Sequence, residues 1–311
     1  MKKIPVWMDC DTGTDDAIAI LLAHALEELD LLAISTVCGN TSQENAFRNT
    51  HGVVGLTGVD YPVFRGAEKP LLQKLEFATA FHGENGLGNV ELPIPEQTVF
   101  RAEKAWDALY ACAAAHPHEL RLVATAPLTN VATAFVKYPE LPHLLHSLCL
   151  MGGSAGPGNI TPAAEFNIYI DPQAAEIVFH SGVKLVMFGL DVTLQEKLVE
   201  DDLDELGASG SKAGEFAGAC LRCALEGMKR YGINGVSMHD SCPVMYLAHP
   251  ELFDGEEAGV VVETRGSITN GKTVTDLYSD KQFPFKNALV MLKVDAEAFI
   301  RILKKRIVSI E

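Results

Sequence analysis

The sequence predicts an α/β protein with an open, mainly parallel sheet flanked by helices, that is, a Rossmann-like core. Short apolar runs alternate with amphipathic helical stretches along most of the 311 residues. The first apolar run ends in a turn and leads directly into a helical stretch. Late in the chain, the β-branched segment 259–276 is typical of an antiparallel strand or hairpin. These three observations define the predicted fold class.

The predicted elements follow one another in a regular order. A strand at 6–10 leaves through a sharp turn at Gly13 and is followed by an apolar helical face at 17–26. Further buried strands are predicted at 31–37, 61–64, 120–124, 148–151 and 184–189, and further helices at 42–58, 102–115 and 171–181. Because helical segments separate several of these strands, crossover connections and a parallel sheet are expected.

The chain is predicted to form a single domain over residues 1–311. We see no internal repeat, low-complexity tract or linker in it. The segment from about 194 to 235 is polar and helix-rich. We therefore interpret it as a helical insertion that walls the active site over the sheet edge.

Composition excludes several classes of partner. The 41 acidic and 25 basic residues leave a net charge of −16, which argues against a nucleic acid or an anionic membrane as partner. No apolar run approaches the ~20 residues of a membrane span. The N-terminus turns acidic too soon for a signal peptide, and seven scattered cysteines are typical of reduced thiols, so a cytoplasmic protein is expected. Cys220 and Cys223 have redox-like spacing, but their apolar helix favours buried structural thiols.

Four carboxylates gather where the first strand gives way to the first helix. Asp9, Asp11, Asp15 and Asp16 lie at the carboxyl end of a strand, where open α/β sheets bind ligands. Carboxylates this close repel one another, and a hard divalent cation such as calcium or magnesium would compensate them. Asp15 and Asp16 could instead complement a helix dipole behind an N-cap at Thr14. That alternative leaves Asp9 and Asp11 unexplained, so metal or ligand chemistry is expected.

Three later stretches carry further polar groups. In 123–130, a strand ends in a turn, and Thr129 is interpreted as an N-cap after Pro127. The glycine-rich stretch 151–167 has neither a phosphate-loop nor a dinucleotide-binding motif, and its polar side chains suit sugar hydroxyls. Taken alone, it is as consistent with an ordinary polar loop as with a site. The pair His239-Asp240 is more often structural than functional, and 82–88 is interpreted only as a flexible loop with one histidine.

The pattern Asp9-x-Asp11-x-Gly13-x-Asp15-Asp16-Ala17 resembles the signature of the inosine-uridine-preferring nucleoside hydrolase family. The resemblance extends from residue 5 to about 287, with five stretches in the same order. Thr12 departs from the proline of many members, Ala126 replaces a glycine, and 241–243 departs from the common Pro-Leu-Ala. The aspartyl-phosphatase turn Asp-x-Asp-x-Thr is a poorer match, since Gly13 occupies its fifth position.

The resemblance implies a Ca²⁺-dependent hydrolase of the N-glycosidic bond of ribonucleosides. Such enzymes serve purine and pyrimidine salvage and associate as homodimers or homotetramers. The implied metal ligands are Asp11, Asp16, the Thr125 carbonyl and Asp240. Asp11 would also be the general base, and His239 with Tyr231 would protonate or polarise the leaving base. The implied substrate-binding residues are Asp15, Asn40, His82, Met151, Asn159, Glu165, Phe166 and Asn167.

Specificity and rival functions remain open at this point. The only tryptophans, Trp7 and Trp106, lie away from the motifs, which argues against the purine-specific subgroup. His239 favours a pyrimidine-preferring or broad specificity, by resemblance. One alternative is a non-catalytic nucleoside- or ribose-binding relative, and another is a metal-dependent phosphatase with Asp9 as nucleophile. A modified ribosyl metabolite as substrate would leave the same catalytic residues.

Overall fold

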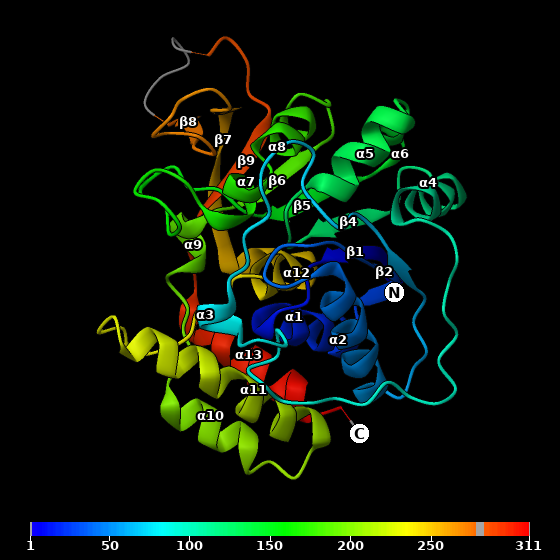
Figure 1. Ribbon diagram of the computed structural model, residues 1–311, viewed down its shortest axis with the longest axis vertical. Coiled ribbons are helices and arrows are strands. Elements are labelled where there is room, and N and C mark those ends of the chain that lie inside the picture. Colours follow the sequence, from blue (N-terminus) through cyan, green and yellow to red (C-terminus); the bar gives the residue numbers. More distant parts are fainter. Residues whose placement is uncertain (1, 278–282, 311) are drawn as a thin grey trace.

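The computed structural model describes residues 2–277 and 283–310. Over these residues the chain forms a sheet whose strands are β1 (Ile4–Cys10), β2 (Leu29–Thr36), β3 (Val63–Arg65), β4 (Arg121–Ala124), β5 (Ser147–Met151), β6 (Leu185–Phe188), β7 (Phe253–Val262), β8 (Thr273–Asp276) and β9 (Ala288–Val294). Their spatial order is β3-β2-β1-β4-β5-β6-β9-β7-β8 (Figure 1). Strands from β3 to β9 pair in parallel, whereas β7 pairs antiparallel with β9 and β8. The predicted fold class is confirmed.

Helices cover both faces of this sheet (Figure 1). In chain order they are α1 (Thr14–Ala25), α2 (Gln43–Leu56), α3 (Thr79–His82), α4 (Ala105–Ala115), α5 (Thr129–Lys137), α6 (Leu141–Leu144), α7 (Phe166–Ile170), α8 (Pro172–Phe179), α9 (Leu190–Thr193), α10 (Glu200–Gly207), α11 (Lys212–Lys229), α12 (Ser241–Ala248), the 3₁₀ turn η1 (Pro250–Leu252) and α13 (Ala296–Val308). No helix in the described part of the chain is long and apolar enough to cross a membrane.

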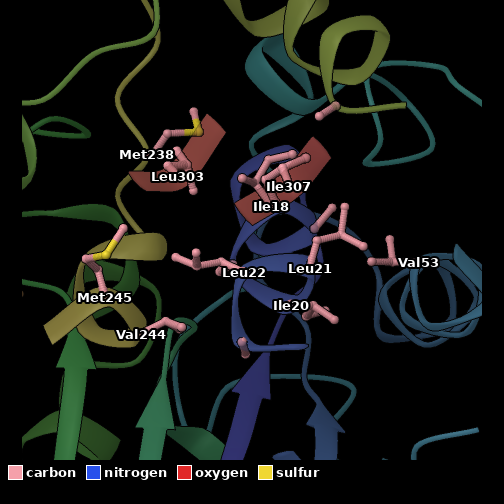
Figure 2. Packing of buried hydrophobic residues seen from close by; sticks show 14 of the residues in the cluster. Ile18, Ile20, Leu21, Leu22, Val53, Met238, Val244, Met245, Leu303 and Ile307 are labelled. Atoms are coloured by element: carbon pink, nitrogen blue, oxygen red, sulfur yellow. The ribbon is translucent and has the colours of Figure 1, made fainter. Parts of the chain in front are cut away.

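Alternation along β1 sends its side chains into two separate cores. Val6, Met8 and Cys10 join the core beneath α1, α2, α12 and α13, and Trp7 joins the core beneath α4, α5 and α8. The Trp7 indole N–H donates to Ser35 Oγ at 2.8 Å, so its one polar atom is satisfied inside the core. Helix α1 is buried over most of its length, and its apolar side chains meet those of α2, α12 and α13 (Figure 2). This packing holds the start of α1 rigidly against the sheet.

Several local expectations were wrong. The N-cap of α1 is Gly13, not Thr14, since the Asp16 carboxylate accepts the Gly13 N–H at 2.9 Å. The N-cap of α5 is Leu128, and the Thr129 hydroxyl instead donates to Asp171 at 2.7 Å. Residues 82–88 are not only a loop, because His82 closes the short helix α3. Strand β9 and helix α13 were not predicted at all.

Successive strands are added on one side of β1 up to β3, and from β4 onward on its other side. From β1 the order runs outward through β2 to β3, and β4 then pairs with the other side of β1. The connections that leave the carboxyl ends of β1 and β4 therefore diverge and open a crevice, which is where such sheets bind ligands. Asp9 pairs with Ala124 in this register, so the first strand and the 125–130 turn meet at one edge.

Candidate active site

A cavity of about 290 Å³ lies at this switch point. Its size suits a small molecule such as a nucleoside. The lining includes most of the residues predicted for the site, namely Asp15, Asn40, His82, Thr125, Met151, Asn159, Glu165, Phe166, Asn167, His239 and Asp240. A more open hollow of about 700 Å³ lies between α10 and α13, but its Lys304 is paired with Asp202 and Glu205. The chemistry is therefore concentrated in the smaller cavity.

Three buried carboxylates converge at the floor of the cavity. Asp15, Asp16 and Asp240 each place an oxygen within 4.8 Å of the others. Burial raises the pKa of each carboxyl, and repulsion from neighbouring aspartates adds to this for Asp16 and Asp240. Asp15 Oδ1 is buried without a hydrogen-bond partner among the described residues. An oxygen-rich, negatively charged cluster with an unsatisfied oxygen fits a hard cation.

Asp11 is buried beside this cluster but is not one of the three. Its carboxylate accepts hydrogen bonds from the Asn40 backbone N–H at 2.5 Å and from Asn40 Nδ2 at 3.2 Å. The same Asn40 amide reaches Asp16 at 3.2 Å. Burial, followed by repulsion from Asp16, raises the pKa of Asp11 well above its ordinary value. The structure thus groups Asp16 and Asp240 with Asp15. The resemblance implied Asp11 as the third carboxylate ligand of the metal.

Thr125 offers the site two oxygens from the end of β4. Its hydroxyl donates to Asp16 Oδ1 at 2.7 Å. Its carbonyl, the predicted ligand, accepts from Asn167 Nδ2 at 3.1 Å. The same Asn167 amide donates to the Met151 carbonyl at 3.2 Å. Asn167 is therefore oriented by its N–H groups, which leaves its side-chain oxygen as the group available to a ligand.

Asp9 lies beneath the site and does not line the cavity. Its Oδ1 accepts from the Ser35 hydroxyl and from Asn130 Nδ2 at 2.8 Å, which joins β1 to β2 and α5. Burial raises its pKa to about 7. This geometry removes the nucleophile that an aspartyl phosphatase would need. Asn130, which the sequence analysis did not single out, is its main amide partner.

The glycine-rich loop forms the opposite wall. Glu165 is the N-cap of α7, and its carboxylate accepts the backbone N–H groups of Gly153, Asn167 and Ile168 at 2.8–3.2 Å. Burial raises the pKa of Glu165 to about 7 despite these donors. Asn159 Oδ1 accepts the Phe166 N–H at 2.9 Å, so the two ends of the loop are tied together.

Two histidines face the cavity from different elements. His82 Nδ1 accepts the Thr14 backbone N–H at 3.1 Å, so its proton resides on Nε2 in the neutral ring. Burial lowers the pKa of His82 to about 4. His239 Nδ1 lies 2.7 Å from the Thr193 hydroxyl oxygen, and burial also lowers the pKa of His239. Both rings are therefore neutral at pH 7.

Asp11 and Tyr231 are the predicted catalytic residues that do not appear in the described lining of the cavity. Asp11 is fully buried, whereas Tyr231 lies at the surface. It is 71% exposed and absent from the described lining, and its ring is stacked against Phe81 with centroids 6.1 Å apart. Phe81 does line the cavity, together with Met228 and Ala224 of α11. A direct role for Tyr231 would require the turn after α11 to move inward.

Several side chains that support the site were not predicted from the sequence. Asp191 and Thr193 belong to α9, directly after β6, and Glu196 follows shortly. Asp191 accepts the N–H groups of Ala155 and Gly156 at 2.7 and 3.0 Å, and thereby holds the glycine-rich loop. Their position after a predicted strand, at the ligand-binding edge, was the available signal.

Fold and site together define a class of enzyme. The family model described as inosine-uridine preferring nucleoside hydrolase matches residues 6–301, almost the whole chain. The chain belongs to this family and is a nucleoside hydrolase, which cleaves ribonucleosides at the N-glycosidic bond.

Individual relatives agree with this assignment. The chain is 42% identical to the pyrimidine-specific ribonucleoside hydrolase RihA of Citrobacter koseri, with 98% of each chain covered. Among solved structures, it is similar to the plant nucleoside hydrolase PpNRh1, with a TM-score of 0.93 and 30% identity over 99% of this chain and 100% of that one. A purine-preferring ribonucleoside hydrolase from Gardnerella vaginalis also has a TM-score of 0.93 and 30% identity, with 98% of each chain covered.

Proposed function

We propose that this enzyme is a Ca²⁺-dependent hydrolase of pyrimidine ribonucleosides, which releases the free base and ribose. The buried group Asp15, Asp16 and Asp240 carries the proposal, since Asp15 and Asp240 also line a nucleoside-sized cavity. The 42% identity to a relative named as pyrimidine-specific supports the choice of base. The apolar groups at the base end, Phe81 and Met228, suit a flat ring without a tryptophan stack.

The cation would be held by Asp16, Asp240 and the Thr125 carbonyl, with Asp15 or Asp11 beside it. Calcium accepts six to eight oxygen ligands, so such a set leaves room for water and for the ribose diol. When bound, calcium would keep the carboxylates ionised and orient both the water and the sugar. Its positive charge would offset both the burial and the mutual repulsion that raise the pKa of these carboxyls in the protein alone.

Asp11 would act as the general base. It takes a proton from the attacking water, whose oxygen forms the new bond to C1′ of the ribose. The C1′–N bond breaks, and its electron pair moves onto the base. General-base help of this kind is worth ~10²–10⁴-fold. The Asn40 contacts fix this carboxylate next to Asp16, which the same Asn40 amide also reaches.

The polar walls would hold the sugar. Asp15 Oδ1 and the Asn167 side-chain oxygen would accept hydrogen bonds from the 2′- and 3′-hydroxyls. Asn159 and Glu165, at the glycine-rich loop, would bind the 5′-hydroxyl. Positive charge that develops on the ribose in an oxocarbenium-like transition state is stabilised by the surrounding carboxylates. A purely binding relative would not need this concentration of negative charge.

His239 would assist the leaving base from the other end of the cavity, with His82 nearby. Because the His82 ring donates from Nε2, it also can bond a base oxygen. We keep Tyr231 as a secondary candidate that would act only after movement of its turn. We further propose a homodimer or homotetramer and, given seven free thiols, a cytoplasmic enzyme.

The test is release of reducing sugar from uridine, cytidine, inosine, adenosine and guanosine, with calcium and after chelation. We expect uridine and cytidine to be hydrolysed fastest and the activity to disappear with the metal. Preferential release from purine nucleosides would contradict the proposed base specificity. Activity that survives complete chelation would contradict the proposed role of calcium.

A further inference from the structure

Helix α9 and the segment that follows it contact the His239-Asp240 dipeptide through two buried side chains. Thr193 Oγ1 lies 2.7 Å from His239 Nδ1. Glu196 accepts the backbone N–H of Met238 at 3.1 Å on each oxygen, which fixes the chain just before the histidine. Thr193 and Glu196 are both 0% exposed, and neither is among the described residues that line the cavity. They can therefore act on a bound nucleoside only through His239 and its neighbours.

The burial of Thr193 decides which atom donates in its contact with His239. Among the described residues, the hydroxyl has one hydrogen-bond partner, His239 Nδ1. If Nδ1 carried the ring proton, the hydroxyl hydrogen would be buried without an acceptor, which is costly. If the hydroxyl donates, both atoms are satisfied, and the proton of the neutral ring lies on Nε2. The second arrangement is therefore the stable one.

The other ring nitrogen is the one that can reach a ligand. His239 lines the cavity, and its Nε2 has no hydrogen-bond partner among the described residues. We propose that Thr193 is a positioning residue that keeps the proton of His239 on Nε2 and so presents a hydrogen-bond donor to the leaving base. The inference rests on the role of His239 in the proposed function.

The Nε2–H group of His239 acts when the C1′–N bond breaks. As the C1′–N bond breaks, its electron pair moves onto the base, and an Nε2–H aimed at the base stabilises that charge by hydrogen bonding. The proton stays on the ring in this step, and the departed base takes its proton from water. Without the Thr193 hydroxyl, the ring could carry its proton on Nδ1, and Nε2 would then present a lone pair to the base.

The decisive variants are Thr193→Val, which keeps the shape and removes the hydroxyl, and Thr193→Ser, which keeps the hydroxyl. Each is assayed with uridine and with p-nitrophenyl riboside, whose nitrophenolate leaves without help. We expect Thr193→Val to lower kcat/KM for uridine about 30-fold, because the ring loses its fixed orientation as well as its fixed tautomer, and with them the hydrogen bond to the leaving base. We expect the value for p-nitrophenyl riboside to stay within about twofold, and Thr193→Ser to recover most uridine activity.

Nitrogen NMR of the labelled imidazole supplies a readout that does not depend on activity. We expect the proton of His239 on Nε2 in the parent enzyme and a mixture of tautomers in Thr193→Val. A proton on Nδ1 in the parent would overturn the inference, even if the valine variant failed to fold. Equal losses on both substrates would also overturn it, since they would show a purely structural role.

His239→Ala separates failure of this inference from failure of the proposed function. If His239→Ala loses uridine activity and Thr193→Val does not, the inference is wrong and the role of His239 stands. If His239→Ala hydrolyses uridine like the parent, the role of His239 is wrong, and the inference falls with it. In the His239→Ala background, we expect Thr193→Val to have no further effect on uridine hydrolysis.

Discussion

Two neighbouring residues fix the carboxylate of Asp11, the proposed general base. The Asn40 backbone and side-chain N–H groups bond it, and Gly39 allows the chain to pass against it. A Cβ atom at Gly39 would collide with the Asp11 carboxylate and with Pro127. The position of the Asp11 carboxylate therefore depends on the absence of a side chain at residue 39.

The first prediction concerns the charge of Asp11. Asp11→Asn preserves the size of the side chain and removes its ability to accept a proton. We expect kcat for uridine to fall ~10²–10⁴-fold, while the inhibition constant for free ribose changes only a few-fold. Steady-state kinetics with ribose as inhibitor measure both. Asp30→Asn, at an exposed position of β2, is the matched control; parent-like turnover in Asp11→Asn would refute the assigned base.

The second prediction concerns Gly39. Gly39→Ala should displace the Asp11 carboxylate and lower kcat by at least about tenfold, with an overpacking cost of ~1–3 kcal/mol in the free energy of unfolding. Urea unfolding and uridine kinetics measure the two effects. Gly207→Ala is the control, because a Cβ there meets open space at the end of α10. Full activity in Gly39→Ala would show that the site tolerates movement of Asp11.

At the scale of elements, α9 supports two walls of the cavity. Asp191 bonds two N–H groups of the glycine-rich loop, and Lys272 and Thr273 of the β7–β8 hairpin bond the Ser154 carbonyl from the other side. The loop is thus hydrogen-bonded to α9 on one side and to the β7–β8 hairpin on the other. Met228 and Ala224 of α11 line the cavity. We therefore propose that residues 194–235 form the wall of the site that was predicted from the sequence.

The third prediction tests this support of the loop. Asp191→Asn replaces a carboxylate that accepts two N–H groups with an amide that accepts less strongly, since hydrogen bonds to charged groups contribute ~1.5–3 kcal/mol. We expect KM for uridine to rise about tenfold with kcat changed less than threefold, because in the proposed function the loop binds the sugar and takes no part in activating the water. Asp201→Asn, exposed on α10, should change neither value. A fall in kcat without a change in KM would place Asp191 in the chemical step instead.

Elements and their order could be predicted from the sequence, because buried parallel strands are short apolar runs between helices. The position of Asp11 and Asp16 after the first strand predicted that the site lies at the carboxyl ends of the strands. Contacts between distant segments could not be predicted in this way. The Asn130 contact with Asp9 and the Thr193 contact with His239 depend on helix rotation and strand register, which composition does not encode. Tyr231 lies outside the cavity for a similar reason, since the path of the turn after α11 decides where its ring lies.

At the scale of the whole molecule, acidic residues outnumber basic ones, and several of the acidic residues are buried together in one place. The chain has a net charge of −16, and Asp11, Asp15, Asp16 and Asp240 lie together in the crevice between the divergent ends of β1 and β4. Burial raises the pKa of all four carboxyls. The protein without metal therefore keeps protons that the unfolded chain releases, so fold stability and metal binding are linked.

The sign of this linkage gives the last prediction. A raised folded-state pKa contributes stability that is complete below the unfolded value of about 4 and is lost as pH rises through the folded value. Metal-free protein should lose this contribution progressively as pH rises above about 4, because the pKa of each of the four carboxyls is raised in the folded state. Calcium should replace it. At 100 times its Kd, calcium adds about 2.7 kcal/mol. We expect the difference in Tm between calcium and EDTA to widen from pH 5 to pH 8, and to shrink in Asp240→Asn but not in Asp30→Asn. A difference that does not vary with pH would show that protons and the metal do not compete for these carboxylates.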